Sequence, residues 1–115
     1  MSTVLLVDDD AIVRKIIGAF LEDRGHTVLA AINGSTARQL AACLEIHILI
    51  SDMQLPDVLG DKLAAELSRM RPRMKVALIS ASESAPANLP DGWMFLRKPF
   101  EPASLLEIIE QFSLR

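Results

Sequence analysis

The chain has 115 residues, 50% of them hydrophobic, which suits a single compact domain with its own core. A formal net charge of −3 provides no basic surface for a phosphate backbone, which disfavours direct nucleic-acid binding, and the single cysteine, Cys43, excludes an internal disulfide and a CxxC metal knuckle. The N-terminal MSTVLLVDDD has no basic segment, and no later run approaches the roughly 20 apolar residues of a membrane span, so we expect a cytoplasmic protein without membrane contact.

Short aliphatic runs alternate with longer segments of helical periodicity along the whole chain. This alternation is typical of successive strand–helix units around a parallel sheet, the α/β class. The predicted strands are 3–7, 27–32, 46–51, 75–79 and 93–97. The predicted helices are 11–24, 34–44, 58–70 and 101–113.

The first predicted helix carries apolar residues in adjacent pairs spaced four positions apart, which predicts one apolar stripe. These residues are Ile12, Val13, Ile16, Ile17, Phe20 and Leu21. Between residues 81 and 92 the sequence ASESAPANLPDG is polar, contains two prolines and has no sustained apolar period. We therefore expect the helix between the last two strands to be short, irregular or missing.

Polar residues follow four of the predicted strands at the point where each strand ends. In chain order these residues are Asp8 with Asp9, then Asp52, Ser80 and Lys98. Because the carboxyl ends of parallel strands line one crevice of an α/β sheet, we expect these side chains to converge. Taken singly, each could also be an ordinary solvated, turn or strand-end residue, and Asp10 is expected to cap the first helix. The coincidence of four strand ends favours one shared site.

The residue types at these strand ends suit phosphoryl chemistry. Crowded carboxylates repel one another unless a cation lies among them, and Mg2+ prefers oxygen ligands. An aspartate such as Asp52 can accept a phosphoryl group as an acyl phosphate. Phosphoryl transfer requires mainly positioning and charge neutralisation, which the Lys98 ammonium and the Ser80 hydroxyl could supply.

Four sequence segments together resemble the receiver domain of two-component response regulators, in particular the chemotaxis-regulator type. They are VLLVDDD, ILISDMQLPDVLG, ALISAS and LRKPF, in that order and with the spacing of that family. The resemblance covers residues 1–115 as one receiver domain. It implies a flavodoxin-like, doubly wound sheet of five parallel strands in the order 2-1-3-4-5, here with a short or irregular fourth helix. It also implies a cis peptide bond between Lys98 and Pro99.

The resemblance further assigns roles to individual residues. Asp52 would be the phospho-acceptor, while Ser80 and Lys98 would contact the phosphoryl oxygens. Mg2+ or Mn2+ would be bound by Asp9, Asp52 and the backbone carbonyl of Gln54, with Asp8 acting largely through metal-bound water. Ser80 and Phe95 would form the switch that reports phosphorylation.

The resemblance implies a signalling switch rather than a turnover enzyme, because such a domain assists only its own phosphorylation and dephosphorylation. Its phosphoryl donor would be a histidine kinase or a histidine phosphotransfer protein, and its output an unidentified downstream protein, with a weak homodimer also allowed. Two alternatives stay open at this point. One is a receiver-like binding module that never carries phosphate, and the other is a haloacid-dehalogenase-type phosphatase using the D-x-D of Asp8 to Asp10, which leaves Asp52 without a role.

Overall fold

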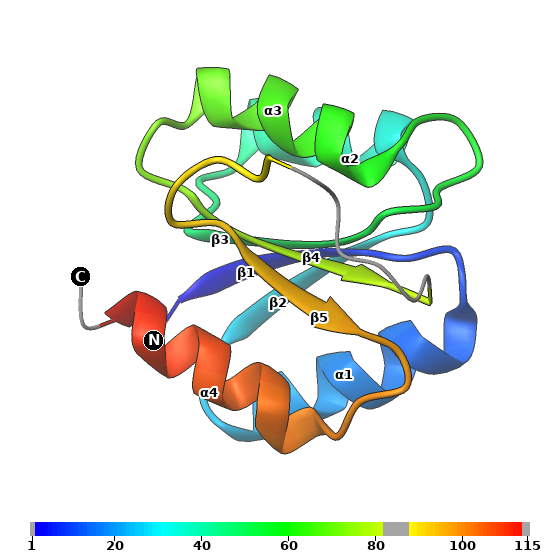
Figure 1. Cartoon of the computed structure of the whole chain (residues 1–115), viewed down its shortest axis with the longest axis vertical. Coiled ribbons are helices and arrows are strands. Elements are labelled where there is room, and N and C mark those ends of the chain that lie inside the picture. The colour runs from blue at the N-terminus through cyan, green and yellow to red at the C-terminus, as the bar shows by residue number, and fades with distance from the viewer. Residues whose placement is uncertain (1, 82–87, 114–115) are drawn as a thin grey trace.

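The computed structural model describes residues 2–81 and 88–113, and these form a five-stranded parallel sheet between two layers of helices (Figure 1). The strands are β1 (Thr3–Val7), β2 (Thr27–Ala31), β3 (Ile48–Asp52), β4 (Lys75–Ser80) and β5 (Met94–Arg97). They pair in the order β2-β1-β3-β4-β5, with every pairing parallel. The predicted flavodoxin-like strand order is therefore confirmed.

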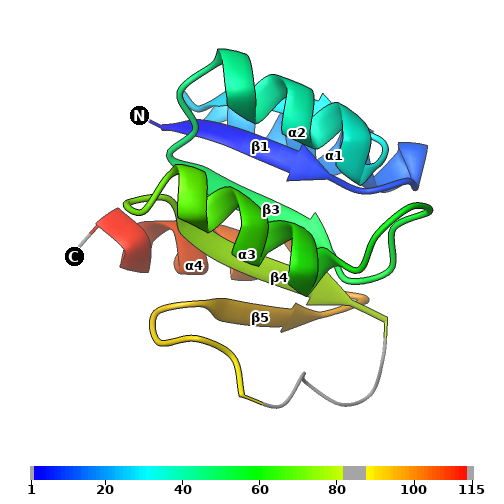
Figure 2. The same ribbon diagram turned by 90° about the horizontal axis from the view of Figure 1, so that it is seen from above.

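Helices cover both faces of the sheet, which is why its central strands are apolar on both sides. Helices α2 (Gly34–Cys43) and α3 (Gly60–Met70) lie on one face, and α1 (Ala11–Asp23) and α4 (Pro102–Ser113) lie on the other (Figures 1 and 2). Alternate residues of β1 enter opposite cores, Leu5 with the α2–α3 layer and Leu6 with the α1–α4 layer. All five residues of β3 are buried, so packing on the strand holds the backbone of Asp52, its last residue.

All of the predicted element boundaries agree with the structure to within two residues. The largest differences are at β3, which begins at Ile48 rather than at residue 46, and at α3, which begins at Gly60 rather than at residue 58. Asp10 caps α1 as expected, since its carboxylate accepts the backbone N–H groups of Ile12 and Val13. The cis peptide bond expected between Lys98 and Pro99 is present.

The apolar stripe predicted along α1 is only partly buried by the rest of the protein. Ile17 and Leu21 are buried, but Ile12 is 69% exposed and Ile16 is 53% exposed. The two exposed isoleucines lie on the side of α1 that faces the loop after β5 rather than the sheet, where they border a groove. Apolar spacing alone could not distinguish this second surface from the core-facing one.

The prediction for the segment between β4 and β5 falls partly outside the described residues, because 82–87 are not among them. Of its described residues, Ala81 and 88–92 include no helical residue, and the N–H of Trp93 closes a turn on the carbonyl of Pro90. Trp93 packs against the core on the α2–α3 side. In the described part of the chain, no helix combines the length and the apolar character needed to cross a bilayer.

Candidate functional site

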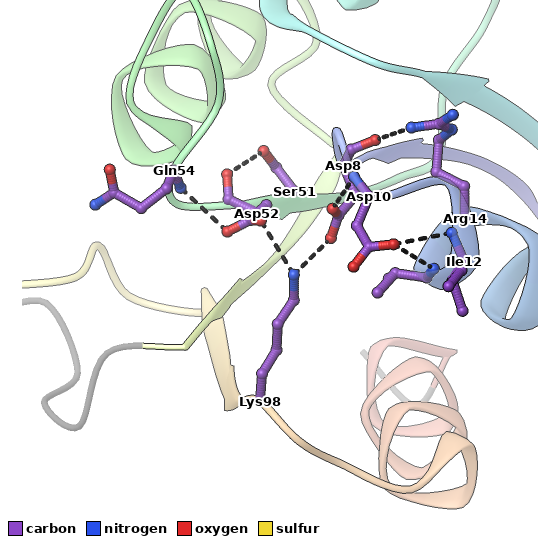
Figure 3. A network of polar contacts seen from close by, with 9 residues as sticks. Asp8, Asp10, Ile12, Arg14, Ser51, Asp52, Gln54 and Lys98 are labelled. Carbon is purple, nitrogen blue, oxygen red and sulfur yellow. Dashed lines mark hydrogen bonds and ion pairs between the residues drawn. The ribbon is translucent and has the colours of Figure 1, made fainter.

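The end of β1 forms a tightly bonded acidic turn (Figure 3). Asp8 is fully buried, and its N–H donates to the carbonyl of Ala31, the last residue of β2. Its carboxylate accepts the N–H of Asp10 at 2.8 Å. Its carbonyl accepts from the guanidinium of Arg14, at the end of the first turn of α1, at 2.6 Å. These three bonds fix the backbone on both sides of Asp9, whose own side chain is exposed.

The end of β3 places Asp52 beside this turn. Asp52 is only 7% exposed, and its Oδ1 accepts the N–H of Gln54 at 3.1 Å. The following loop returns so closely that a Cβ on Gly60 would lie 2.2 Å from the Asp52 carbonyl oxygen. Glycine is therefore required at position 60 if the loop is to keep this path around the Asp52 carboxylate.

Lys98 joins the two buried carboxylates, although 46 and 90 residues separate it from them in sequence. Its Nζ lies 2.9 Å from Oδ2 of Asp8 and 3.1 Å from Oδ2 of Asp52, and Figure 3 shows it between them. Partial burial by itself would lower the pKa of Lys98, but the hydrogen bonds and charges of both aspartates outweigh that effect and raise it. One ammonium thus partly neutralises two carboxylates that lie out of bulk water.

A third carboxylate completes a cluster with more negative charge than Lys98 can neutralise. Asp8, Asp9 and Asp52 each offer an oxygen, and these oxygens lie within 4.8 Å of one another. An all-oxygen donor set with an excess of negative charge suits a hard divalent cation such as Mg2+. The exposed Asp9 leaves one side of the cluster open to solvent, from which an ion could enter. The donor chemistry therefore fits the metal that the sequence suggested.

Ser80 and Phe95 occupy different parts of the structure. Ser80 is 2% exposed, ends β4 next to the end of β3, and its carbonyl accepts the N–H of Lys98 at 2.7 Å. Phe95 lies on β5 opposite Leu78 and is half-buried against the α2–α3 core. The predicted acidic, hydroxyl and basic residues are thus brought to one end of the sheet, whereas Phe95 lies back along the edge strand.

Sequence reasoning missed two residues that support the site. Arg14 supports the turn between Asp8 and Asp9, as described above. Asp57, in the loop after β3, accepts the N–H groups of Gly34 and Ser35 at the start of α2. An aspartate five residues after Asp52 carries no sign in the sequence that it reaches the next helix along the sheet.

Known proteins with related sequences include regulators and a sensor kinase. The chain is 30% identical over 111 residues to the transcriptional regulatory protein GlrR of Escherichia coli (strain K12), covering 93% of this chain and 25% of that protein. It is 34% identical over 116 residues to the sensor kinase CckA of Brucella abortus (strain 2308), covering 96% of this chain and 12% of that protein. The chain therefore spans only a minor part of the length of either relative.

The fold and the family are also shared with solved structures. The response regulator receiver domain protein (CheY-like) from Methanospirillum hungatei JF-1 superposes with a TM-score of 0.89 at 26% identity, covering 99% of this chain and 95% of that one. The family model described as the response regulator receiver domain matches residues 4–110. The chain accordingly belongs to the response regulator receiver domains, the phosphoryl-accepting signalling switches of two-component systems.

Proposed function

We propose that Asp52 is the residue that accepts the phosphoryl group and that residues 1–115 act as one receiver domain. The observation that carries this proposal is the Lys98 bridge. A cation 3.1 Å from the Asp52 carboxylate and 2.9 Å from that of Asp8 supplies the charge that a transferred phosphoryl group needs beside it. Asp52 is the member of the acidic cluster that both contacts Lys98 and lies at the end of the central strand β3.

The proposed reaction is the transfer of a phosphoryl group from a phosphohistidine of a histidine kinase or a histidine phosphotransfer protein. An Asp52 carboxylate oxygen attacks phosphorus, the phosphorus–nitrogen bond breaks, and the imidazole leaves and takes up a proton. Asp9 and Asp52, with the Gln54 carbonyl, would hold Mg2+ or Mn2+ directly and Asp8 through water; when bound, the metal neutralises charge on the phosphoryl oxygens. Lys98 and the Ser80 hydroxyl contact the same oxygens.

The proposed output starts at Ser80, which ends β4 beside the acceptor. A hydrogen bond from its hydroxyl to a phosphoryl oxygen would draw the end of β4 toward Asp52. Phe95 lies on the neighbouring strand β5, half-buried, and we propose that its ring changes position with this shift. Phosphorylation would thereby alter the surface around β5, where a downstream protein could detect it.

A groove beside the site is suited to the phosphohistidine-bearing partner. Its volume is about 550 Å3, and it lies between Ile12 and Ile16 of α1 and the residues around Phe100 after β5. Lys98 is also part of its lining, so an apolar helix of the partner seated there would lie next to the acceptor site. Two isoleucines more than half exposed on one helix face are consistent with such a docking surface.

Intact-mass measurement after incubation with a small phosphodonor and Mg2+ tests the acceptor assignment. We expect one labile phosphoryl addition in the wild type and none in Asp52→Asn. An unmodified wild type, alongside a receiver domain that is phosphorylated in the same tube, would favour a module that never carries phosphate. Sustained hydrolysis of a generic phosphate ester would indicate a phosphatase rather than a signalling switch.

The docking groove is tested separately with Ile16→Lys. We expect this variant to lose phosphoryl transfer from a phosphohistidine protein while keeping phosphorylation by the small phosphodonor, because the acidic site itself is unchanged. The exposed Lys15→Met serves as a control on the same helix. Equal loss with both donors would place the defect in the site and refute the docking role of the groove.

A further inference from the structure

A carboxylate in the loop after β3 caps a helix on the neighbouring side of the site. Oδ1 of Asp57 accepts the N–H of Gly34 at 2.8 Å, and Oδ2 accepts the N–H of Ser35 at 3.0 Å. The bond from Gly34 is the main cause of the lowered pKa of Asp57, so the carboxylate is ionised throughout the neutral range. An anionic oxygen pair on free N–H groups at a helix start is a favourable, charge-assisted contact.

The same contact brings the loop and the start of α2 unusually close. A Cβ on Gly34 would lie 2.5 Å from Cγ1 of Val58, the neighbour of Asp57, so only glycine allows this approach. The capping residue of α2 itself, Asn33, uses its side chain for a different donor, the N–H of Thr36 at 2.9 Å. Gly34 and Ser35 are thereby left for Asp57.

The loop held by Asp57 also closes on the acceptor. The N–H of Gly60 donates to the carbonyl of Met53 at 2.8 Å, and Gln54 pairs with Leu59 across the loop. The N–H of Gln54 then donates to the Asp52 carboxylate. A displacement of the loop would consequently shift the Asp52 carboxylate and the backbone of Gln54.

Asp57 is the main side-chain anchor of this loop. In the loop 53–59 its carboxylate accepts two backbone N–H groups of α2, whereas Leu59, the residue before α3, provides no side-chain cap. On the far side, α2 follows β2, whose last residue Ala31 accepts the N–H of Asp8. The contact of Asp57 with α2 therefore ties the loop of Asp52 to the strand end that carries Asp8.

We propose that Asp57 is a positioning residue that holds the loop 53–59 against α2 and so sets the affinity of the acidic site for Mg2+ and the lifetime of the acyl phosphate at Asp52. The lifetime part rests on the proposed function, whereas the metal part rests only on the acidic cluster. A looser loop presents the Asp52 carboxylate and the Gln54 backbone less uniformly to the ion. It also admits water more readily to phosphorus, whose bond to the Asp52 oxygen then breaks to release inorganic phosphate.

The test compares Asp57→Ala with Asn33→Ala, which removes the other cap of the same helix without touching the loop. Three quantities are measured: amide hydrogen exchange of Gln54 and Gly60 without metal, Mg2+ affinity by calorimetric titration, and the half-life of the phosphorylated protein. We expect Asp57→Ala to expose both amides to faster exchange, weaken Mg2+ binding about tenfold and shorten the half-life. Asn33→Ala should leave all three near the wild-type values.

Two further variants keep the proposal open to refutation. Asp23→Asn removes one negative charge from an 84% exposed position at the far end of α1 and should not change Mg2+ affinity, which separates net charge from positioning. If Asp57→Ala folds poorly, Asp57→Asn retains one acceptor oxygen and should give an intermediate effect. Unchanged exchange and Mg2+ affinity in both Asp57 variants, or an equal change in Asn33→Ala, would overturn the proposal. A wild type that accepts no phosphoryl group would contradict only the proposed function, because exchange and Mg2+ affinity still decide the role of Asp57.

Discussion

Replacing Lys98 with methionine removes the one cation seen between the Asp8 and Asp52 carboxylates while keeping most of the side-chain volume. The Lys98 side chain is 21% exposed, that of Asp8 is fully buried and that of Asp52 is 10% exposed. Removing one partner of a buried ion pair typically costs about 3–5 kcal/mol. Because the Asp9 side of the cluster is open to water, we expect a smaller loss of unfolding free energy, about 2–3 kcal/mol at neutral pH without metal.

Mg2+ should compensate for this loss. In Lys98→Met the ion no longer shares the carboxylates with an ammonium, so it should bind more tightly than in the wild type. A ligand present at a hundred times its Kd stabilises a folded protein by about 2.7 kcal/mol, and more if its Kd falls further below that concentration. The stabilisation gained from a fixed Mg2+ concentration should therefore be larger in the variant.

Urea unfolding followed by the fluorescence of Trp93, in chelator and in Mg2+, measures both effects. Lys15→Met, which removes an exposed lysine from α1, is the control. The raised pKa of Lys98 adds a pH signature, since its contribution to stability is complete below its ordinary value of 10.5 and is lost as the pH rises through the higher folded value. Unchanged stability without metal, or equal gains from Mg2+ in variant and wild type, would show that the Lys98 charge does not stabilise the paired carboxylates.

Substitutions at Asp9, Gly60 and His26 probe the metal site, the acceptor loop and the pH dependence of stability. Asp9→Asn should weaken Mg2+ binding by at least about tenfold in calorimetric titration. Its urea midpoint without metal should not fall, because Asp9 is exposed and its charge repels the other two carboxylates. Gly60→Ala should lower the unfolding free energy by more than about 2 kcal/mol, because the added Cβ would lie 2.2 Å from the Asp52 carbonyl oxygen, and a wild-type urea curve would contradict this. Partial burial lowers the pKa of the His26 imidazole, so its contribution to the unfolding free energy should be complete above pH 6.5 and be lost as the pH falls below that value. His26→Gln should flatten this dependence of stability on pH. An unchanged slope would exclude His26 as its source.

Local sequence patterns were sufficient for the fold because each strand and its terminal residue lie next to each other in the chain. The run TVLLV both forms a buried strand and delivers Asp8 to the end of the sheet, and KVALIS does the same for Ser80. Parallel pairing then brings the strand ends together without further information. The convergence of Asp8, Asp52 and Lys98 could therefore be predicted before any contact was known.

Contacts that depend on tertiary packing could not be predicted in this way. Asp57 reads as a turn residue, and its bonds to α2 arise only because Gly34 lets the loop approach. Ile12 and Ile16 follow the same spacing as the buried Ile17, yet they lie outside the part of α1 that the sheet covers. Periodicity reports which residues share a helix face, but the neighbouring elements decide whether that face is buried.

Mapping the phosphorylated residue decides whether Asp52 is the acceptor. The wild type is incubated with a small phosphodonor and Mg2+, the acyl phosphate is reduced with borohydride to mark the modified aspartate, and the peptides are mapped by mass spectrometry. We predict that the mark lies on Asp52 alone and depends on Mg2+. A mark on Asp8 or Asp9, or phosphorylation that persists in Asp52→Asn, would show that Asp52 is not the acceptor.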